Sequence, residues 1–179
     1  MDAQMVTAIF TALAAFAALG TAIAAFLQIR MSRQSISVDV LLRLDAHFNS
    51  PDMKTIRSNA AAFLLKYQFG QHHVLPTGNR IALESLLDFF EGIASLSLRK
   101  GTPDPESVWC FFFPWIERYC WAAERFIKET QENDPLRWQD LIRLHKQLEK
   151  IERKYRPDYK PPDEDQLRRF LEDEMQLSV

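Results

Sequence analysis

The chain has 179 residues and a formal net charge of −2, so positive and negative side chains nearly balance. This balance excludes the electrostatic footprint of a nucleic-acid-binding protein, and we predict no nucleic-acid partner. Only five residues are glycine whereas 26% are charged, a composition that favours a helical protein over a turn-rich β-sheet protein.

The N-terminal stretch from Ala3 to Leu27 contains no charged side chain. As a helix it would extend roughly 37 Å, which is enough to cross a hydrocarbon layer about 30 Å thick. A cleaved signal peptide would carry a basic residue near its start, but the first basic residue is Arg30. A buried core helix and a removed leader are the alternatives. We predict that residues 1–29 form a transmembrane anchor.

The charges that flank this stretch predict its orientation. Arg30, Arg33 and Arg43 follow it, whereas only Asp2 precedes it. An excess of Lys and Arg marks the cytoplasmic side of a membrane span. We therefore expect a single-pass protein of the plasma membrane, with a short N-terminus outside and the rest of the chain in the cytoplasm.

One face of the predicted span carries small residues at helical spacing. Small side chains let helix backbones approach closely in lipid, where packing drives association. The face could then serve self-association or packing against a partner helix. We favour the alternative that the pattern is accidental in an alanine-rich anchor. The residues of this face are Thr11, Ala15, Ala18, Ala22 and Ala25.

Apolar residues at helical spacing predict one helix over residues 30–48 and a second over residues 51–69. Ser50 is a suitable N-cap for the second helix, and Pro51 fits its first turn, where a missing N–H is harmless. No glycine or proline separates the first helix from the predicted anchor, so the two can be continuous. Residues 70–78 are typical of a loop.

A third helix is predicted over residues 79–99, with a glycine after it as its C-cap. Its apolar residues cover a broad face, so it should be central. Thr102 or Asp104 can cap a fourth helix, which extends to about Gln131. Pro114 lies inside this fourth element, and we expect a kink or a break just before it.

A fifth helix is predicted from residues 133–135 to about Tyr155, and prolines then predict an extended linker before a short amphipathic segment. No alternating pattern typical of strands occurs. The predicted fold class is all-α, with one N-terminal transmembrane helix followed by a cytoplasmic bundle of about five helices. The predicted domains are the anchor over 1–29, the helical domain over 30–156, and the linker with its short segment over 157–179.

Three segments of the predicted helical region carry a family resemblance. They are FNSPDM followed by an arginine-bearing helix, then LLDFFEGIASLSLRKGTPDPESVW, then ERYCWAAERFIKE. Together they resemble a bacterial family catalogued only as a domain of unknown function, over roughly residues 5 to 155. The resemblance implies one hydrophobic helix in the bacterial inner membrane before a helical cytoplasmic region. It implies no catalytic residue, because none is established for the family.

Glu91 lies among apolar residues of the predicted third helix, where a carboxylate needs a nearby cation to stay charged. Arg57 on the second helix and Arg118 on the fourth are candidate partners. We predict a buried polar network of these three residues that fixes how the helices align. A catalytic role is the alternative, and it would require a cleft that also contains Tyr119.

Aromatic residues are densest between Trp109 and Trp121. Trp and Tyr favour the membrane interface, so the cluster could lie against the bilayer, bind an apolar ligand or receive a partner helix. We favour the alternative that the rings fill the centre of the bundle. The cluster consists of Trp109, Phe112, Phe113, Trp115, Tyr119 and Trp121.

No sequence motif predicts a reaction. The chain contains no nucleophile elbow, zinc-protease helix, phosphate-binding loop or dinucleotide fingerprint. Cys110 and Cys120 lack an adjacent base, and the histidines lack the spacing of zinc ligands. We therefore predict no catalytic residue, no metal site and no cofactor.

These observations favour a membrane protein whose cytoplasmic helical domain serves protein interaction or scaffolding. A sensor or effector subunit that oligomerises through its transmembrane helix is the alternative, and a membrane-tethered enzyme is a third. The expected partners are the membrane and either a second copy or a partner membrane protein.

Overall fold

The structure is a computed structural model. It describes residues 37–70, 77–100 and 102–178, together with the isolated helical residues Thr21, Ala25 and Gln28. The chain divides into two units, Met1–Asp39 and Val40–Val179. The predicted anchor thus lies almost entirely outside the described residues. Within the described part, no helix is both long and apolar enough to cross a membrane.

Every regular element among the described residues is helical, which confirms the predicted all-α fold class. Residues 37–48 form a helical segment that precedes the labelled elements. A short π-helix (Leu96–Lys100) continues α3, and a 3-10 turn (Gln176–Ser178) follows α7. The labelled helices are α2 (Pro51–Phe69), α3 (Thr77–Ser95), α4 (Pro105–Ala122), α5 (Glu124–Gln131), α6 (Gln139–Tyr155) and α7 (Glu164–Met175).

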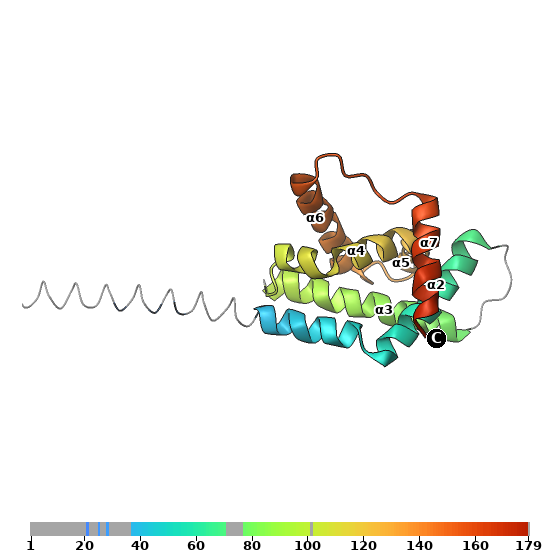
Figure 1. Cartoon of the computed structure of the whole chain (residues 1–179), viewed down its shortest axis with the longest axis horizontal. Helices are drawn as coiled ribbons and strands as arrows, with labels where there is room; N and C mark the ends of the chain where they lie inside the picture. The colour runs from blue at the N-terminus through green and yellow to red at the C-terminus, as the bar shows by residue number, and fades with distance from the viewer. Residues whose placement is uncertain are drawn as a thin grey trace, which may run out of the picture. The chain divides into compact units, whose positions relative to one another are not determined.

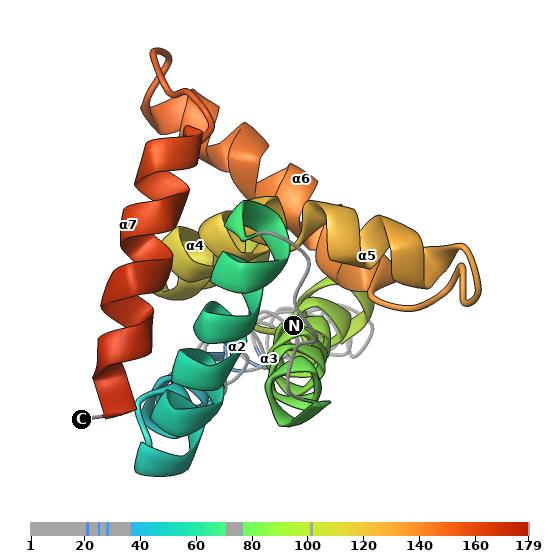
Figure 2. The ribbon, with the colours of Figure 1, turned by 90° about the vertical axis from the view of Figure 1, so that its right-hand side faces the viewer.

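Helix α3 packs against both α2 and α6, and α4 packs on α6. The C-terminal helix α7 lies across α2 and also contacts α4 (Figures 1 and 2). Aromatic rings fill the space between these helices, because each buries a large apolar area. The largest fully buried side chains include Phe48, Phe90, Phe112, Tyr119 and Trp138.

Two helices begin where the sequence predicts them, because their caps lie in the adjacent residues. The Ser50 hydroxyl accepts the Met53 backbone N–H at 3.3 Å, and Pro51 occupies the first turn of α2. Asp104, rather than Thr102, caps α4 by accepting the Ser107 backbone N–H at 3.0 Å. Each side chain satisfies a donor that the first helical turn leaves unpaired.

Of the kink or break expected just before Pro114, the break is wrong, because α4 continues through this proline to Ala122. A proline removes the hydrogen bond to the carbonyl four residues earlier, here that of Cys110. Both residues are exposed, so water can satisfy the freed carbonyl. The chain instead breaks at Ala123, between α4 and α5. Apolar residues continue at helical spacing from α4 into α5, so the sequence pattern does not indicate this break.

The predicted start of the fifth helix at residues 133–135 is also wrong, since α6 begins at Gln139. Asp134 accepts the Leu136 backbone N–H at 3.3 Å, which holds the preceding residues in a turn. Trp138 then adopts a left-handed backbone conformation with φ of 55°. The predicted end of this helix at Tyr155 is confirmed.

Glu174 fastens α7 to the rest of its unit. Its carboxylate accepts hydrogen bonds from Nε of Arg57, at 2.7 Å, and from Nη2 of the same guanidinium. The Tyr119 hydroxyl of α4 donates to this carboxylate at 2.8 Å. The guanidinium also packs over the Phe48 ring, 4.1 Å from its centroid. The two parallel bonds make this a bidentate ion pair, and both charged side chains are buried. Charge-assisted hydrogen bonds of this kind are stronger than neutral ones and fix the relative orientation of the two side chains.

We expect Glu174→Ala to lower the free energy of unfolding by about 3–5 kcal/mol, because it leaves a buried guanidinium without its counter-charge. Urea unfolding of the full chain, followed by circular dichroism, measures this loss. Glu172→Ala changes an exposed residue of the same helix and should cost less than about 0.5 kcal/mol. Equal stability of the two variants would show that the ion pair does not hold α7 in place.

Candidate functional site

Helix α4 has two neighbouring faces, one that packs in the core and one that lines the surface. The first face is fully buried, and the other lines a groove. Side chains four residues apart lie on one helix face, which explains why Trp109, Phe113 and Glu117 share the groove side. The buried face consists of Val108, Phe112, Ile116 and Tyr119.

The other walls of this groove come from the end of α6, the linker after it, and α7. The groove has a volume of about 870 Å³, within the range of roughly 300–1,000 Å³ that is usual for ligand sites. We call it the α4–α7 groove. Besides the α4 residues, its lining includes Glu152, Arg156, Tyr159, Lys160, Pro162, Gln166, Arg169, Phe170 and Asp173.

Two buried carboxylates join the walls of the α4–α7 groove. Glu152 of α6 accepts the indole N–H of Trp109 at 2.7 Å and pairs with Arg156 at 3.1 Å. Glu117 of α4 accepts the hydroxyl of Tyr159, which lies in the linker. These bonds connect α4 to α6 and to the linker.

Burial raises the pKa of the Glu117 carboxyl above its usual value, while Tyr159 and Arg118 oppose the rise. Burial and the adjacent Glu117 carboxylate likewise raise the pKa of the Tyr159 hydroxyl. The raised pKa of Tyr159 keeps the proton on its hydroxyl at neutral pH, so Tyr159 is the donor and the Glu117 carboxyl the acceptor. The pair therefore acts as a fixed hydrogen bond between α4 and the linker.

Aromatic contacts reinforce the same walls. The Trp109 ring stacks on Tyr155 with centroids 5.0 Å apart, and the Phe170 ring of α7 meets Tyr119 edge-on at 5.1 Å. The Arg118 guanidinium lies 5.3 Å from the centroid of Phe170. Such contacts favour one relative position of the helices, because ring faces and edges carry opposite partial charges.

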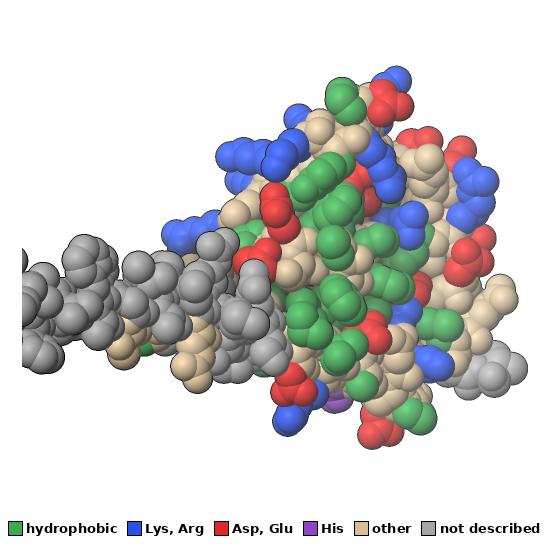
Figure 3. Space-filling view, turned by 60° about the vertical axis from the view of Figure 1, so that its left-hand side comes forward, with side chains coloured by type: hydrophobic (Ala, Val, Ile, Leu, Met, Phe, Trp, Pro, Cys, Tyr) green, Lys and Arg blue, Asp and Glu red, His purple; other side chains and the backbone are tan. Residues whose placement is uncertain are grey.

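Figure 3 shows hydrophobic side chains gathered on one face of the molecule, with charged side chains around them.

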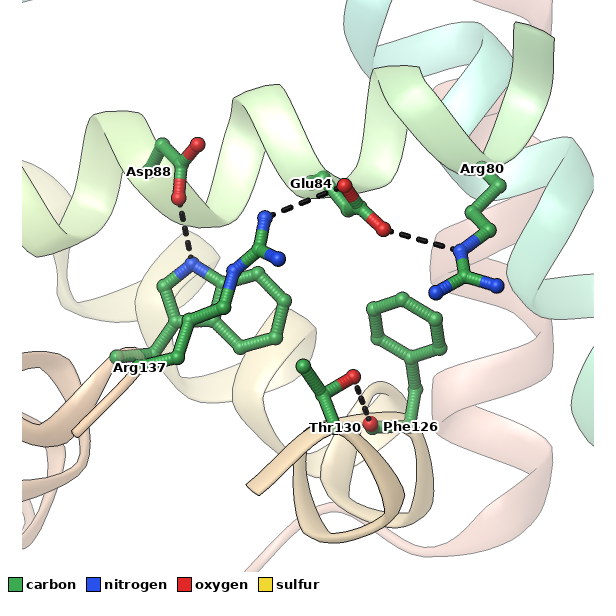
Figure 4. A network of polar contacts seen from close by, with 7 residues as sticks. Arg80, Glu84, Asp88, Phe126, Thr130 and Arg137 are labelled. Carbon is green, nitrogen blue, oxygen red and sulfur yellow. Dashed lines mark hydrogen bonds and ion pairs between the residues drawn. The ribbon is translucent and has the colours of Figure 1, made fainter. Parts of the chain in front are cut away.

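A second hollow of about 690 Å³ is lined by residues of α2, α3 and α5, and a polar network borders it (Figure 4). Glu84 of α3 accepts hydrogen bonds from Arg80 at 3.0 Å and from Arg137 at 3.2 Å. Asp88, one turn further along α3, accepts the indole N–H of Trp138 at 2.7 Å. The network holds the turn between α5 and α6 against α3, so we assign it to the fold.

Glu91 continues the acidic face of α3 and caps α6. Its carboxylate accepts the backbone N–H of Leu141 at 2.6 Å and that of Asp140 at 3.3 Å. Both donors belong to the first turn of α6, whose N-cap residue Trp138 provides no side-chain acceptor. A carboxylate at this position satisfies unpaired donors and complements the helix dipole.

The predicted network of Arg57, Glu91 and Arg118 is not formed as one cluster. Arg57 pairs with Glu174, Arg118 lies over an aromatic ring, and Glu91 caps α6. The three side chains point to different neighbours because α3 presents Glu91 to α6, whereas α2 presents Arg57 to α7. Of the three residues in the alternative catalytic cleft, Arg57 and Tyr119 meet at the Glu174 carboxylate, whereas Glu91 bonds to the start of α6.

The aromatic cluster divides between the core and the surface. Phe112, Phe113 and Tyr119 are buried, as expected for rings that fill the bundle. The three tryptophans, Trp109, Trp115 and Trp121, are only half-buried. Trp109 and Phe113 also line the α4–α7 groove, so the cluster contributes to packing and to a surface hollow at once.

The other residues singled out in the sequence are the small-residue face, the two cysteines and the possible metal ligands. Of the small-residue face, only Ala25 is described, and it is helical and exposed, while Thr11, Ala15, Ala18 and Ala22 lie outside the described residues. Cys110 is exposed and Cys120 is buried, and burial raises the pKa of the Cys120 thiol. Among the residues described, no three His, Cys, Asp or Glu side chains gather where they could hold a metal ion.

No protein-family model, curated protein or solved structure matches this chain. The resemblance to a bacterial family of membrane-anchored helical proteins therefore stays a prediction.

Sequence reasoning missed Glu174 and Glu117. Both are acidic residues on an apolar helix face, which is the pattern that drew attention to Glu91. Glu174 shares its helix face with Leu167 and Leu171, which are buried. Glu117 follows Phe113 by one helical turn and is buried as well. An acidic residue on an apolar face indicates a buried partner. The pattern does not identify that partner, since it comes from a distant segment.

We expect Glu91→Ala to lower the free energy of unfolding by about 1–2 kcal/mol, the usual cost of losing an N-cap. Glu91→Gln keeps an acceptor oxygen and should cost less than Glu91→Ala. Urea unfolding of the full chain measures both variants. A loss above about 4 kcal/mol for Glu91→Ala would instead indicate that a buried charge had lost its partner.

His145 of α6 packs edge-on against Trp121, with ring centroids 6.0 Å apart. Its Nε2 atom is buried and has no hydrogen-bond partner in the described part of the chain. Burial, with a smaller contribution from Lys146, lowers the pKa of His145 from 6.5 to about 4, while Glu124 opposes the change. The native structure therefore holds this imidazole in its neutral form.

The lowered pKa of His145 predicts a loss of stability in acid. Between pH 6.5 and about pH 4 the unfolded chain binds a proton that the folded chain excludes, so stability falls as the pH falls through this window. The loss should reach about 2–3 kcal/mol near pH 4. Thermal melts across this range should show a smaller loss for His145→Gln. His47→Gln, at an exposed position, should leave the pH dependence unchanged, and identical profiles for both variants would contradict the assignment.

Proposed function

We propose that this chain is a membrane-anchored interaction protein. The N-terminal stretch holds it in the plasma membrane, the helical unit lies in the cytoplasm, and the α4–α7 groove receives a segment of a partner protein. The observation that carries this proposal is the groove itself, whose lining combines aromatic rings with cationic side chains. Aromatic and arginine residues are the ones that contribute most to protein binding.

The way the groove is built favours binding. Hydrogen bonds of Glu152 and Glu117 connect α4 to α6 and to the linker, and Glu174 connects α7 to α2 and α4. Walls held in this way lose little conformational freedom when a partner docks, so less of the interaction free energy is lost to ordering. Polar groups that hold the walls already have partners and need not be desolvated again.

The anchor is supported by the sequence. The uncharged stretch from Ala3 to Leu27 is long enough to span a bilayer, and arginines follow it rather than precede it. A groove held beside a membrane meets membrane-bound partners at a raised local concentration. Anchor and groove are thus two separable parts of one proposal.

The anchor predicts that the intact chain stays with the membrane fraction after washing with alkaline carbonate, because a spanning helix is released only when lipid is dissolved. Detergent should then release it. A variant that lacks residues 1–29 is the control and should appear in the soluble fraction. Release of the intact chain by carbonate would contradict the anchor.

The groove predicts position-dependent cross-linking in intact cells. A benzophenone amino acid at Asp173, which lines the groove, should give one discrete adduct with another polypeptide after illumination. The same amino acid at the adjacent Glu172, which is exposed but does not line the groove, is the matched control and should give none. Equal yields at the two positions would contradict docking in the groove.

A further inference from the structure

The charges of the α4–α7 groove point to the chemistry of its occupant. Arg118, Lys160 and Arg169 line the groove, and none of them forms an ion pair with a described residue. Arg118 lies over an aromatic ring, and the Nε of Arg169 donates to the backbone carbonyl of Asp165 at 3.3 Å. None of the three charges is thus held in an ion pair within the described part of the chain, although Arg118 lies close enough to the Glu117 carboxylate to oppose the rise that burial causes in its pKa.

The acidic residues of the same groove do not cancel this charge. Glu152 is paired with Arg156 and bonded to Trp109, and Glu117 is buried and accepts the Tyr159 hydroxyl, so neither carboxylate lies at the surface of the groove. Of the acidic residues that line the groove in the described part of the chain, Asp173 alone is exposed. The surface that an occupant meets is therefore positive overall.

The apolar part of the groove adds a second requirement. The rings of Trp109, Phe113 and Phe170 lie in its lining, and burying a large side chain against such rings is favourable. The three cations come from three separate elements, α4, the linker and α7. Such a distribution suits several carboxylates spaced along a chain better than a single phosphate group, which favours donors that converge on one point.

From this arrangement we infer that the α4–α7 groove binds an acidic peptide segment that carries a large apolar side chain. The carboxylates of the segment pair with Arg118, Lys160 and Arg169, and its apolar side chain rests on the aromatic rings. The inference depends on the proposed docking function and specifies the chemical class of the partner.

Fluorescence anisotropy of a labelled octapeptide with alternating glutamate and phenylalanine tests this inference on the full chain in a mild nonionic detergent. This peptide should bind at least about tenfold more tightly than a lysine–phenylalanine or a glutamate–serine peptide of the same length. The double variant Lys160→Glu, Arg169→Glu should weaken binding at least about tenfold. The matched control is Lys146→Glu, an exposed cation of α6 that does not line the groove, and it should change affinity less than about twofold.

Two outcomes would overturn the inference. Equal binding of the three peptides would show that acidic and apolar groups are not both recognised. Binding of mixed micelles of the detergent and phosphatidylserine, lost in the double variant, without binding of the glutamate–phenylalanine peptide would identify a lipid surface as the occupant. If the Asp173 adduct persists in either case, the docking function stands and only the chemistry of the partner is wrong. If that adduct is absent as well, both proposals fail.

Discussion

The buried ion pair between Arg57 and Glu174 is the constraint that decides where the C-terminal helix lies. An unpaired charge in the interior is strongly unfavourable, so α2 and α7 must meet where these two side chains bond. Tyr119 donates to the same carboxylate and thereby includes α4 in the contact. Because α7 is one wall of the α4–α7 groove, the groove depends on this ion pair.

Carboxylates join helices at other places in the described part of the chain. Glu91 of α3 caps α6, Glu152 of α6 bonds to α4, and Glu117 of α4 bonds to the linker. Apolar contacts alone tolerate sliding and repacking, whereas directional bonds in a low-dielectric interior select one arrangement. A groove with fixed walls, as the proposed docking function requires, is the consequence of this construction.

Helix limits were predictable where the determinant is local. Ser50 and Asp104 satisfy donors of the turn that follows them, so both starts follow from adjacent residues. The break at Ala123 was not predictable, because the apolar spacing of α4 continues into α5 without interruption. Pro114 did not end α4, although it removes one backbone hydrogen bond and crowds the preceding helical turn.

The sequence by itself determined the all-α class, the packing of rings such as Phe112 and Tyr119 inside the bundle, and a buried contact of Arg57 with an acidic residue. Only the tertiary structure decided which acid that is. Glu91 and Glu174 both lie among apolar side chains, and the choice between them depends on α7 packing across α2. The start of α6 was likewise decided by Glu91, which belongs to α3. A local pattern indicates which buried side chains need a hydrogen-bonding or charged partner. Which residue that partner is depends on distant segments that only folding brings together.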